Sequence, residues 1–450
     1  MSKLKSEIKL GLSFSSHPIH KNPKRWCDAI TNGKRVCMNR FGKFYFALLF
    51  SLIIFILILC SSSVQSFSLL QSQDFESSII SDPVDLSKMT WETFFDEVRN
   101  YEKTHDFLKK IMEENKIPGI SIALTQKGSG RKQTKTLFFY LGVEDPNTCE
   151  PIDGETVFRA GRLGQPVFSY MIMKLFIGRR FDIDIPLHKY LPKPIPDYPA
   201  YQDLKDDSRY KRLTASRILS HQSGLVNLRL THPEHRLTFE ADPGKEFRYS
   251  EEGYRLLQFV LEQRFGRSLN DLAKIVVFDR LSMKNSSFVS QSWFEGQLEK
   301  PMQTGDFPEY NASDASEEFF TNAKDYANFI WTVLYSGGLL DPQICAPYFQ
   351  PEISVNSPTI LEPPLSREHP TIPKKLSWCL GWGTYQISQD MVYFIGDRFQ
   401  GIECFAIMSL SHRSAVTIFV VGNDQHSVTG QILREIIGDI ELPLTWLGFE

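Results

Sequence analysis

Cysteine is scarce in this 450-residue chain, which contains seven of them. Cys27, Cys37 and Cys60 lie near the N-terminus, so only four remain for the rest of the chain. So few cysteines cannot build the disulfide framework that stabilises small secreted domains. A single pair could still form in an oxidising compartment, and Cys379 and Cys404, which fall in two predicted strands, are the preferred partners.

Metal-ligand patterns and internal repeats are also missing. No spacing of Cys or His resembles a zinc site, and we expect neither a metal nor a cofactor. No repeat with a period of about 20–50 residues is visible, which argues against a solenoid. The chain does have 42% hydrophobic and 13% aromatic residues, enough for a sizeable core. Its length allows two or three domains or one large α/β domain.

Positive charge gathers at the N-terminus, where residues 1–43 contain ten Lys or Arg and two acidic residues. A basic patch often indicates nucleic-acid binding, but this one directly precedes an apolar run at residues 44–60. The run is just long enough for a membrane-spanning helix, which needs about 17–25 residues. Because positive flanks stay cytoplasmic, we expect a membrane partner, a main domain on the non-cytoplasmic side and no nucleic acid.

Two forms of export remain open. A retained signal anchor would give a membrane-anchored protein, whereas cleavage near the small residues at 63–66 would give a secreted one. Met38 could begin an ordinary signal peptide directly before the apolar run. A lipoprotein site at Cys60 is disfavoured because Leu59 is too large for the usual processing, and the basic flank argues against a buried core helix.

The remainder divides into a Ser-rich linker, residues 61–95, and one large domain, residues 96–445. Apolar spacing predicts a helix over about residues 91–115, which Pro118-Gly119 ends before an antiparallel hairpin. The hairpin strands are predicted at 120–124 and 136–141. Further helices are predicted at 167–177, 214–219, 253–264, 269–278, 321–336 and 428–437. Further strands are predicted at 378–387, 391–395, 403–410 and 415–421.

This order favours one antiparallel sheet made from both chain ends, with helices around it. The predicted fold class is therefore α/β (α+β). Residues 160–300 would form a helical insert subdomain, and residues 96–159 and 301–445 together an α/β subdomain.

Four short motifs follow one another along this domain. They are Ile117-Pro-Gly-Ile-Ser-Ile-Ala123, Phe181-Asp-Ile-Asp-Ile-Pro-Leu-His-Lys-Tyr-Leu-Pro192, His221-Gln-Ser-Gly-Leu225 and Thr321-Asn-Ala-Lys-Asp-Tyr326. Their order and spacing resemble the β-lactamase-related serine hydrolases, which include class C β-lactamases, D-alanyl-D-alanine carboxypeptidases and esterases. The resemblance covers roughly residues 100–440 and implies a β-lactamase/transpeptidase-like fold.

The resemblance also implies a catalytic machinery, and the chain departs from it. The family places a nucleophilic Ser at a helix start and a Lys one turn later, as Ser-x-x-Lys. Here these positions correspond to Arg162 and Gln165. Arg is permanently cationic and has no lone pair for attack, and Gln cannot exchange a proton near neutral pH.

The two other family elements are altered as well. In Tyr-x-Asn, Tyr249 is kept but Glu251 replaces the Asn. The His-x-Gly or Lys-x-Gly strand should lie near residues 394–401, where Asp397 falls on the Gly when Gly401 is matched to the later family Gly. The degenerate positions Arg162, Tyr249, Glu251 and Asp397 are the candidate binding residues.

A buried Arg needs a carboxylate partner, so we expect an ion pair between Arg162 and Glu251 in a closed site. One other Ser-x-x-Lys, at Ser208 and Lys211, lies in a polar run and is interpreted as a solvated loop. His221 is interpreted as structural, because its family counterpart holds a loop.

The favoured hypothesis is an exported or membrane-anchored member of this family that has lost acyl-enzyme chemistry. It would keep a binding or scaffold role toward a peptidoglycan-like peptide or a protein partner. The alternatives are an active serine hydrolase with a rearranged site and a purely structural domain.

Overall fold

The computed structural model describes residues 86–127, 134–145, 149–294, 313–335, 347–363, 375–387, 390–399, 401–422 and 427–449. The N-terminal region 1–43, the apolar segment 44–60 and most of the linker 61–95 lie outside the described residues. Every helix within the described ranges is too short or too polar to cross a bilayer.

A nine-stranded antiparallel sheet forms the centre of the fold, in the order β5-β4-β3-β13-β12-β11-β10-β9-β8. Its two halves come from opposite chain ends, because β3 pairs with β13 and brings Ile122 opposite Ile418. This confirms the predicted fold class. The strands are β3 (Gly119–Lys127), β4 (Thr134–Asp145), β5 (Glu150–Pro151), β8 (Ile353–Ser354), β9 (Leu376–Trp378), β10 (Gly383–Ile387), β11 (Asp390–Phe399), β12 (Ile402–Ser409) and β13 (Ser414–Val421).

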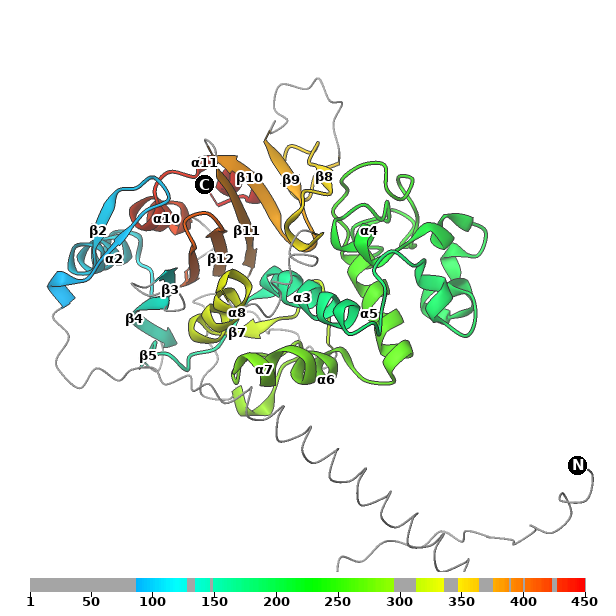
Figure 1. Cartoon of the computed structure of the whole chain (residues 1–450), viewed down its shortest axis with the longest axis horizontal. Helices are drawn as coiled ribbons and strands as arrows, with labels where there is room; N and C mark the ends of the chain where they lie inside the picture. Colours follow the sequence, from blue (N-terminus) through cyan, green and yellow to red (C-terminus); the bar gives the residue numbers. More distant parts are fainter. Residues whose placement is uncertain are drawn as a thin grey trace, which may run out of the picture. The chain divides into compact units, whose positions relative to one another are not determined.

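Helices cover both faces of this sheet (Figure 1). Helix α8 (Ala323–Tyr335) packs across β3 and β13, while α10 (Thr429–Ile437) packs on β13 and on α2 (Tyr101–Asn115). Every residue of β12 and of β13 is buried as a result. Strands covered on both faces lose the alternation of apolar and polar residues, which is why these two are nearly continuous apolar runs.

Most of the helices in the described part of the chain lie between β6 (Phe158–Arg159) and β7 (Phe320–Thr321). Helix α3 is buried almost all round, so it acts as a core helix rather than as an amphipathic surface helix. Ser and Thr side chains cap the helices that follow: Thr214 caps α4, Ser250 caps α5 and Ser268 caps α6. The helices are α3 (Gly164–Ile177), α4 (Ala215–Leu219), α5 (Glu251–Phe265), α6 (Leu269–Ala273), the π-helix Lys274–Phe278 and α7 (Asp279–Leu281).

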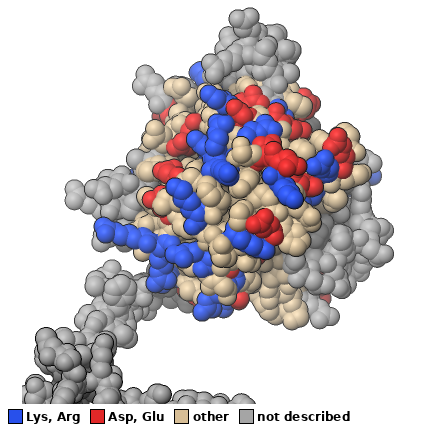
Figure 2. Space-filling model, turned by 90° about the vertical axis from the view of Figure 1, so that its right-hand side faces the viewer, with Lys and Arg blue, Asp and Glu red and all other residues tan. Residues whose placement is uncertain are grey.

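Seen from the side of α4 and α5, the surface carries both signs of charge. Figure 2 shows acidic and basic side chains intermixed over this face. Ion pairs such as Arg209 with Asp207 and Arg248 with Glu240 belong to the same helical part of the chain.

Two predicted elements differ from the structure. The helix expected from residue 91 begins only at Tyr101, after a hairpin of β1 (Thr90–Glu92) and β2 (Val98–Asn100). A long-range hydrogen bond stabilises the hairpin over the expected helix, because the Trp91 indole N–H donates to the Ile436 carbonyl at 2.8 Å. The strand expected at 378–387 is divided into β9 and β10 by a reversal at Gly381, whose φ is +83°.

The disulfide left open between Cys379 and Cys404 does not form, because both are buried free thiols. Cys379 follows β9 and Cys404 lies in β12, with β10 and β11 between these strands. Adjacent strands are about 4.8 Å apart, which places the two cysteines well beyond the Cα separation that a disulfide tolerates. Each thiol donates instead to a backbone carbonyl, Cys379 to Phe349 and Cys404 to Ala160.

Candidate functional site

Arg162 stands in the 3-10 turn Gly161–Leu163, immediately before α3. Its backbone N–H donates to Asp397 Oδ2 at 3.0 Å, and its Nη1 lies 3.4 Å from Asp397 Oδ1. Asp397 reaches the turn from β11. Gly161, with φ of +44°, makes this approach possible, because a Cβ there would overlap the Asp397 carboxylate.

The predicted partner of Arg162 was Glu251, and this prediction is wrong: the carboxylate within ion-pairing distance is Asp397. The Arg162 guanidinium also lies over the Tyr249 ring, 5.2 Å from its centroid, in a cation–π contact. Burial by itself lowers the pKa of Arg162, but Asp397, Tyr249 and Glu251 outweigh it and raise the pKa above its ordinary value. The guanidinium is therefore permanently charged.

Gln165, which the sequence comparison with the family places at the lysine of Ser-x-x-Lys, is completely buried. Its Nε2 donates to Tyr249 Oη at 2.8 Å and to the Ser316 carbonyl at 3.2 Å. Its Oε1 lies 3.3 Å from His221 Nε2. Since His221 Nδ1 accepts from the Ser250 backbone N–H, the ring proton is on Nε2 and donates to Gln165.

These bonds form one chain of fixed direction, from Ser250 through His221 and Gln165 to Tyr249. Burial and the Arg162 charge lower the pKa of His221 to about 3, which keeps its ring neutral. Burial raises the pKa of Tyr249 above its ordinary value, so the phenol keeps its proton. No member of the chain can accept a proton from a reacting group near neutral pH without losing an existing bond.

Glu251 is the first residue of α5 and is buried. Burial, together with a hydrogen bond and repulsion from Glu317, raises its pKa well above the ordinary carboxyl value. Arg255, one turn along α5, lies 3.7 Å from both Glu251 and Glu317 and only 2.7 Å from Asp314. Glu251 thus belongs to a carboxyl cluster centred on Arg255, and the ion pair with Arg162 is formed by Asp397 instead.

Two serine hydroxyls near this cluster already donate hydrogen bonds to backbone carbonyls. Ser169 is fully buried and donates to the Leu380 carbonyl, while Ser250 caps α5 and donates to the Val226 carbonyl. Ser208, the serine of the other Ser-x-x-Lys sequence, lies exposed in the 3-10 turn Ser208–Arg212. Across the described ranges, no group of three His, Cys, Asp or Glu is arranged to hold a metal ion.

The structure thus brings Arg162, Gln165, Tyr249 and Asp397 into direct contact and places Glu251 beside them. Sequence reasoning missed the bond from His221 to Gln165 and the hydrogen bond between Asp397 and the Arg162 backbone. The bond to Asp397 could have been suspected, because a charged residue replaces the family glycine at position 397. The bond between His221 and Gln165 could not, because a Gln in a buried helix does not by itself indicate a partner.

An antiparallel sheet made from both chain ends, with a nucleophile position at the start of the central helix α3, defines the β-lactamase/transpeptidase-like class of serine hydrolases. The family model described as Beta-lactamase matches residues 105–431. This chain belongs to that family.

Solved structures share this fold. The octameric penicillin-binding protein homologue from Pyrococcus abyssi has a TM-score of 0.59 and 16% identity, over 77% of this chain and 79% of its own. The β-lactamase/D-alanine carboxypeptidase from Yersinia pestis has a TM-score of 0.58 and 14% identity, over 75% and 98%. At these identities the likeness shows the fold alone.

A human protein, the mitochondrial serine β-lactamase-like protein LACTB, is 26% identical over 127 residues. This stretch makes up 28% of the present chain and 21% of the human protein. The chain therefore matches about a fifth of the length of that relative.

Proposed function

We propose that this chain is a catalytically degenerate β-lactamase-family protein that keeps a binding or scaffold role. The observation that carries the proposal is the pair Arg162–Asp397 at the nucleophile position. Acyl transfer in this family needs a hydroxyl, a proton acceptor and donors for the developing oxyanion. Each of the three is lost for its own reason.

A guanidinium replaces the hydroxyl, and a cation without a lone pair cannot attack a carbonyl. Gln165 replaces the lysine, and its amide is committed to Tyr249 and His221. The match to the family would make the Arg162 backbone N–H a donor to the oxyanion, but it donates to the Asp397 carboxylate. A negative oxygen arriving there would meet a carboxylate instead of a vacant donor.

Binding next to this cluster is the activity that the geometry leaves open. A cavity of about 200 Å³ reaches Tyr249 and is lined by polar Asn227 and Arg248 and by apolar Ile360 and Leu361. Such a mixture suits a peptide-like ligand, and we propose a peptidoglycan-like peptide or a segment of a protein partner. A rise in melting temperature with a purified muropeptide would support the peptidoglycan-like peptide. An unchanged melting temperature would favour the segment of a protein partner.

The experiment that tests lost catalysis is labelling with a fluorescent penicillin, followed by gel fluorescence. We expect no covalent label on the natural chain. A restored variant carrying Arg162→Ser, Gln165→Lys, Glu251→Asn and Asp397→Gly should gain hydrolysis of an activated ester. Label on any serine of the natural chain would support the alternative, an active hydrolase with a rearranged site.

We further propose that the chain is exported, either membrane-anchored or secreted, with its main domain on the non-cytoplasmic side and no nucleic-acid partner. The basic residues 1–43 before the apolar run 44–60 support this orientation. Mass determination of the mature N-terminus separates the two forms. An intact residue 1 together with resistance to alkaline extraction indicates an anchor, and a start after residue 60 indicates cleavage.

A further inference from the structure

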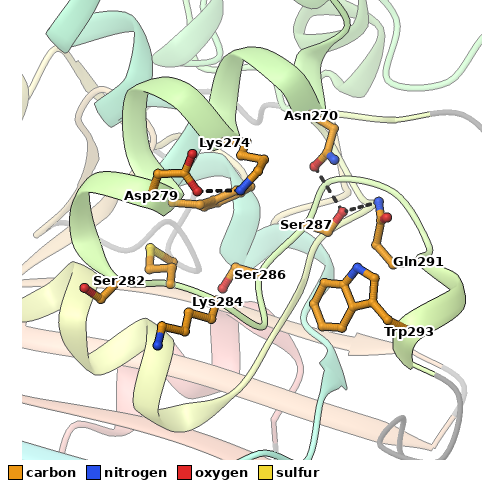
Figure 3. A pocket seen from close by; sticks show the side chains of 11 residues that line it. Asn270, Lys274, Asp279, Ser282, Lys284, Ser286, Ser287, Gln291 and Trp293 are labelled. Atoms are coloured by element: carbon orange, nitrogen blue, oxygen red, sulfur yellow. Dashed lines mark hydrogen bonds and ion pairs between the residues drawn. The ribbon is translucent and has the colours of Figure 1, made fainter. Parts of the chain in front are cut away.

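A second cavity, of about 450 Å³, lies away from the Arg162 cluster and shares no lining residue with it. One wall comes from α6, the π-helix Lys274–Phe278 and α7, and the other from the loop at 282–294. Figure 3 shows Gln291 and Trp293 on one side of this space and the Lys274–Asp279 pair on the other. π-helices are rare and are found often at functional sites.

Two amides in the wall have fixed orientations. Asn270 Oδ1 accepts from the Ser287 hydroxyl at 3.0 Å and from the Phe288 backbone N–H at 2.9 Å. Gln291 Nε2 donates to the Ser287 hydroxyl at 3.1 Å. The carbonyl of Asn270 and the amino group of Gln291 are thus used by the protein. The wall therefore retains an amide donor on Asn270 and an amide acceptor on Gln291 for a ligand.

Trp293 adds a large apolar surface beside these amides. It is 45% exposed, although a tryptophan is normally well buried. The buried ring of Phe294 packs against it edge-on, with centroids 4.2 Å apart. The indole is therefore held in place while much of its surface remains open to solvent.

The charges of the lining leave a small positive excess. Lys274 and Asp279 form an ion pair at 2.5 Å and neutralise each other. Lys284 also lines the cavity and is exposed. Its ammonium acts electrostatically on Glu155, but Glu155 is ion-paired with Lys324 at 2.9 Å, so one positive charge remains in excess. This excess favours a ligand with a single negative charge, because a polyphosphate would meet repulsion from Asp279.

We propose that this cavity binds a sugar ring that carries an acidic group. Sugar hydroxyls both donate and accept, which matches the Asn270 and Gln291 amides. The C–H face of a pyranose carries partial positive charge and fits the electron-rich face of Trp293. A carboxylate on the same sugar would reach Lys284. The volume falls in the range of small-molecule pockets, about 300–1,000 Å³.

The test is a glycan array that displays uronate, sialylated and neutral oligosaccharides, followed by calorimetry with digalacturonate and neutral galactobiose. We expect acidic glycans to be retained and digalacturonate to bind more tightly than galactobiose. Trp293→Ala should weaken both sugars by about tenfold, the equivalent of roughly 1.4 kcal/mol. Lys284→Met should abolish the preference for the acidic sugar. Phe399→Ala and Lys189→Met, exposed residues outside this cavity, serve as matched controls.

Three results would overturn the proposal. The first is an array on which no acidic glycan is retained. The second is binding that survives Trp293→Ala unchanged. The third is tighter binding of ADP than of digalacturonate, which would make the cavity a nucleotide site.

Discussion

Asp397 and Arg162 are separated by 235 positions, yet the carboxylate of one receives the backbone N–H of the other at 3.0 Å. The same carboxylate faces the Arg162 guanidinium at 3.4 Å. Arg162 and Asp397 therefore belong together, because the aspartate neutralises the arginine, and a buried arginine without this partner would be costly. In the proposed function, this pair takes the place of the family's nucleophile.

Asp397→Ala should destabilise the protein, because it leaves the guanidinium of Arg162 and a backbone N–H unpaired. We expect a loss of about 3–5 kcal/mol in the free energy of unfolding, measured by urea denaturation. Adding Arg162→Met should recover most of it. Lys110→Ala, which removes an exposed i,i+4 pair, should cost at most about 0.5 kcal/mol. Equal effects of Asp397→Ala and Lys110→Ala would contradict this view of the pair.

Gly161→Ala should cost more stability than Gly266→Ala. Both glycines have positive φ, +44° and +62°, so each alanine carries a backbone penalty of roughly 1–2 kcal/mol. Only at position 161 does the new Cβ overlap Asp397, while nothing lies within 4 Å at position 266. We expect an additional loss of about 1–3 kcal/mol at 161 in thermal or urea unfolding. Identical losses at the two positions would show that Asp397 does not approach the turn.

Glu251→Gln should flatten the pH dependence of stability. Burial raises the folded pKa of Glu251 above its unfolded value of 4.5, so the folded state binds more protons than the unfolded state. Its contribution is fully present below pH 4.5 and decreases as the pH rises, by on the order of 1.4 kcal/mol per pH unit. The variant should lose less stability than the natural chain between pH 5 and pH 8. Parallel stability curves would mean that Glu251 is ionised in the folded protein.

Cys379 and Cys404 should remain protected thiols. Both are buried and each donates to a carbonyl, whereas Cys149 is exposed. Alkylation followed by peptide mass mapping should modify Cys149 in the native protein, and the other two only after unfolding. Recovery of a peptide linked through Cys379 and Cys404 under non-reducing conditions would contradict the strand order.

The sequence was sufficient to predict the fold class and the family, while the match of Arg162 and Gln165 to the family's catalytic positions stays a prediction. The apolar runs at 403–410 and 415–421 are local signals, so these two strands could be predicted from the sequence alone. The pairing of Arg162 with Asp397 was not local. The pairing depends on how β11 is aligned beside the 3-10 turn that contains Arg162. From charge alone, Glu251 was as suitable a partner for Arg162 as Asp397.

Tertiary contacts also explain where the prediction differs from the structure. Residues 91–100 have helical spacing, but the bond from Trp91 to Ile436 favours a hairpin that rests on α10. Cys379 and Cys404 were correctly placed in or next to strands. They do not pair because β10 and β11 lie between these strands, which sequence order does not reveal.

The most direct measurement of the central claim is the intact mass of the purified protein after incubation with a fluorophosphonate, which captures activated serines. With Arg162 at the nucleophile position and its N–H bound to Asp397, the mass should not change. A single added phosphonate that maps to a serine peptide, and that disappears on prior denaturation, would contradict the account.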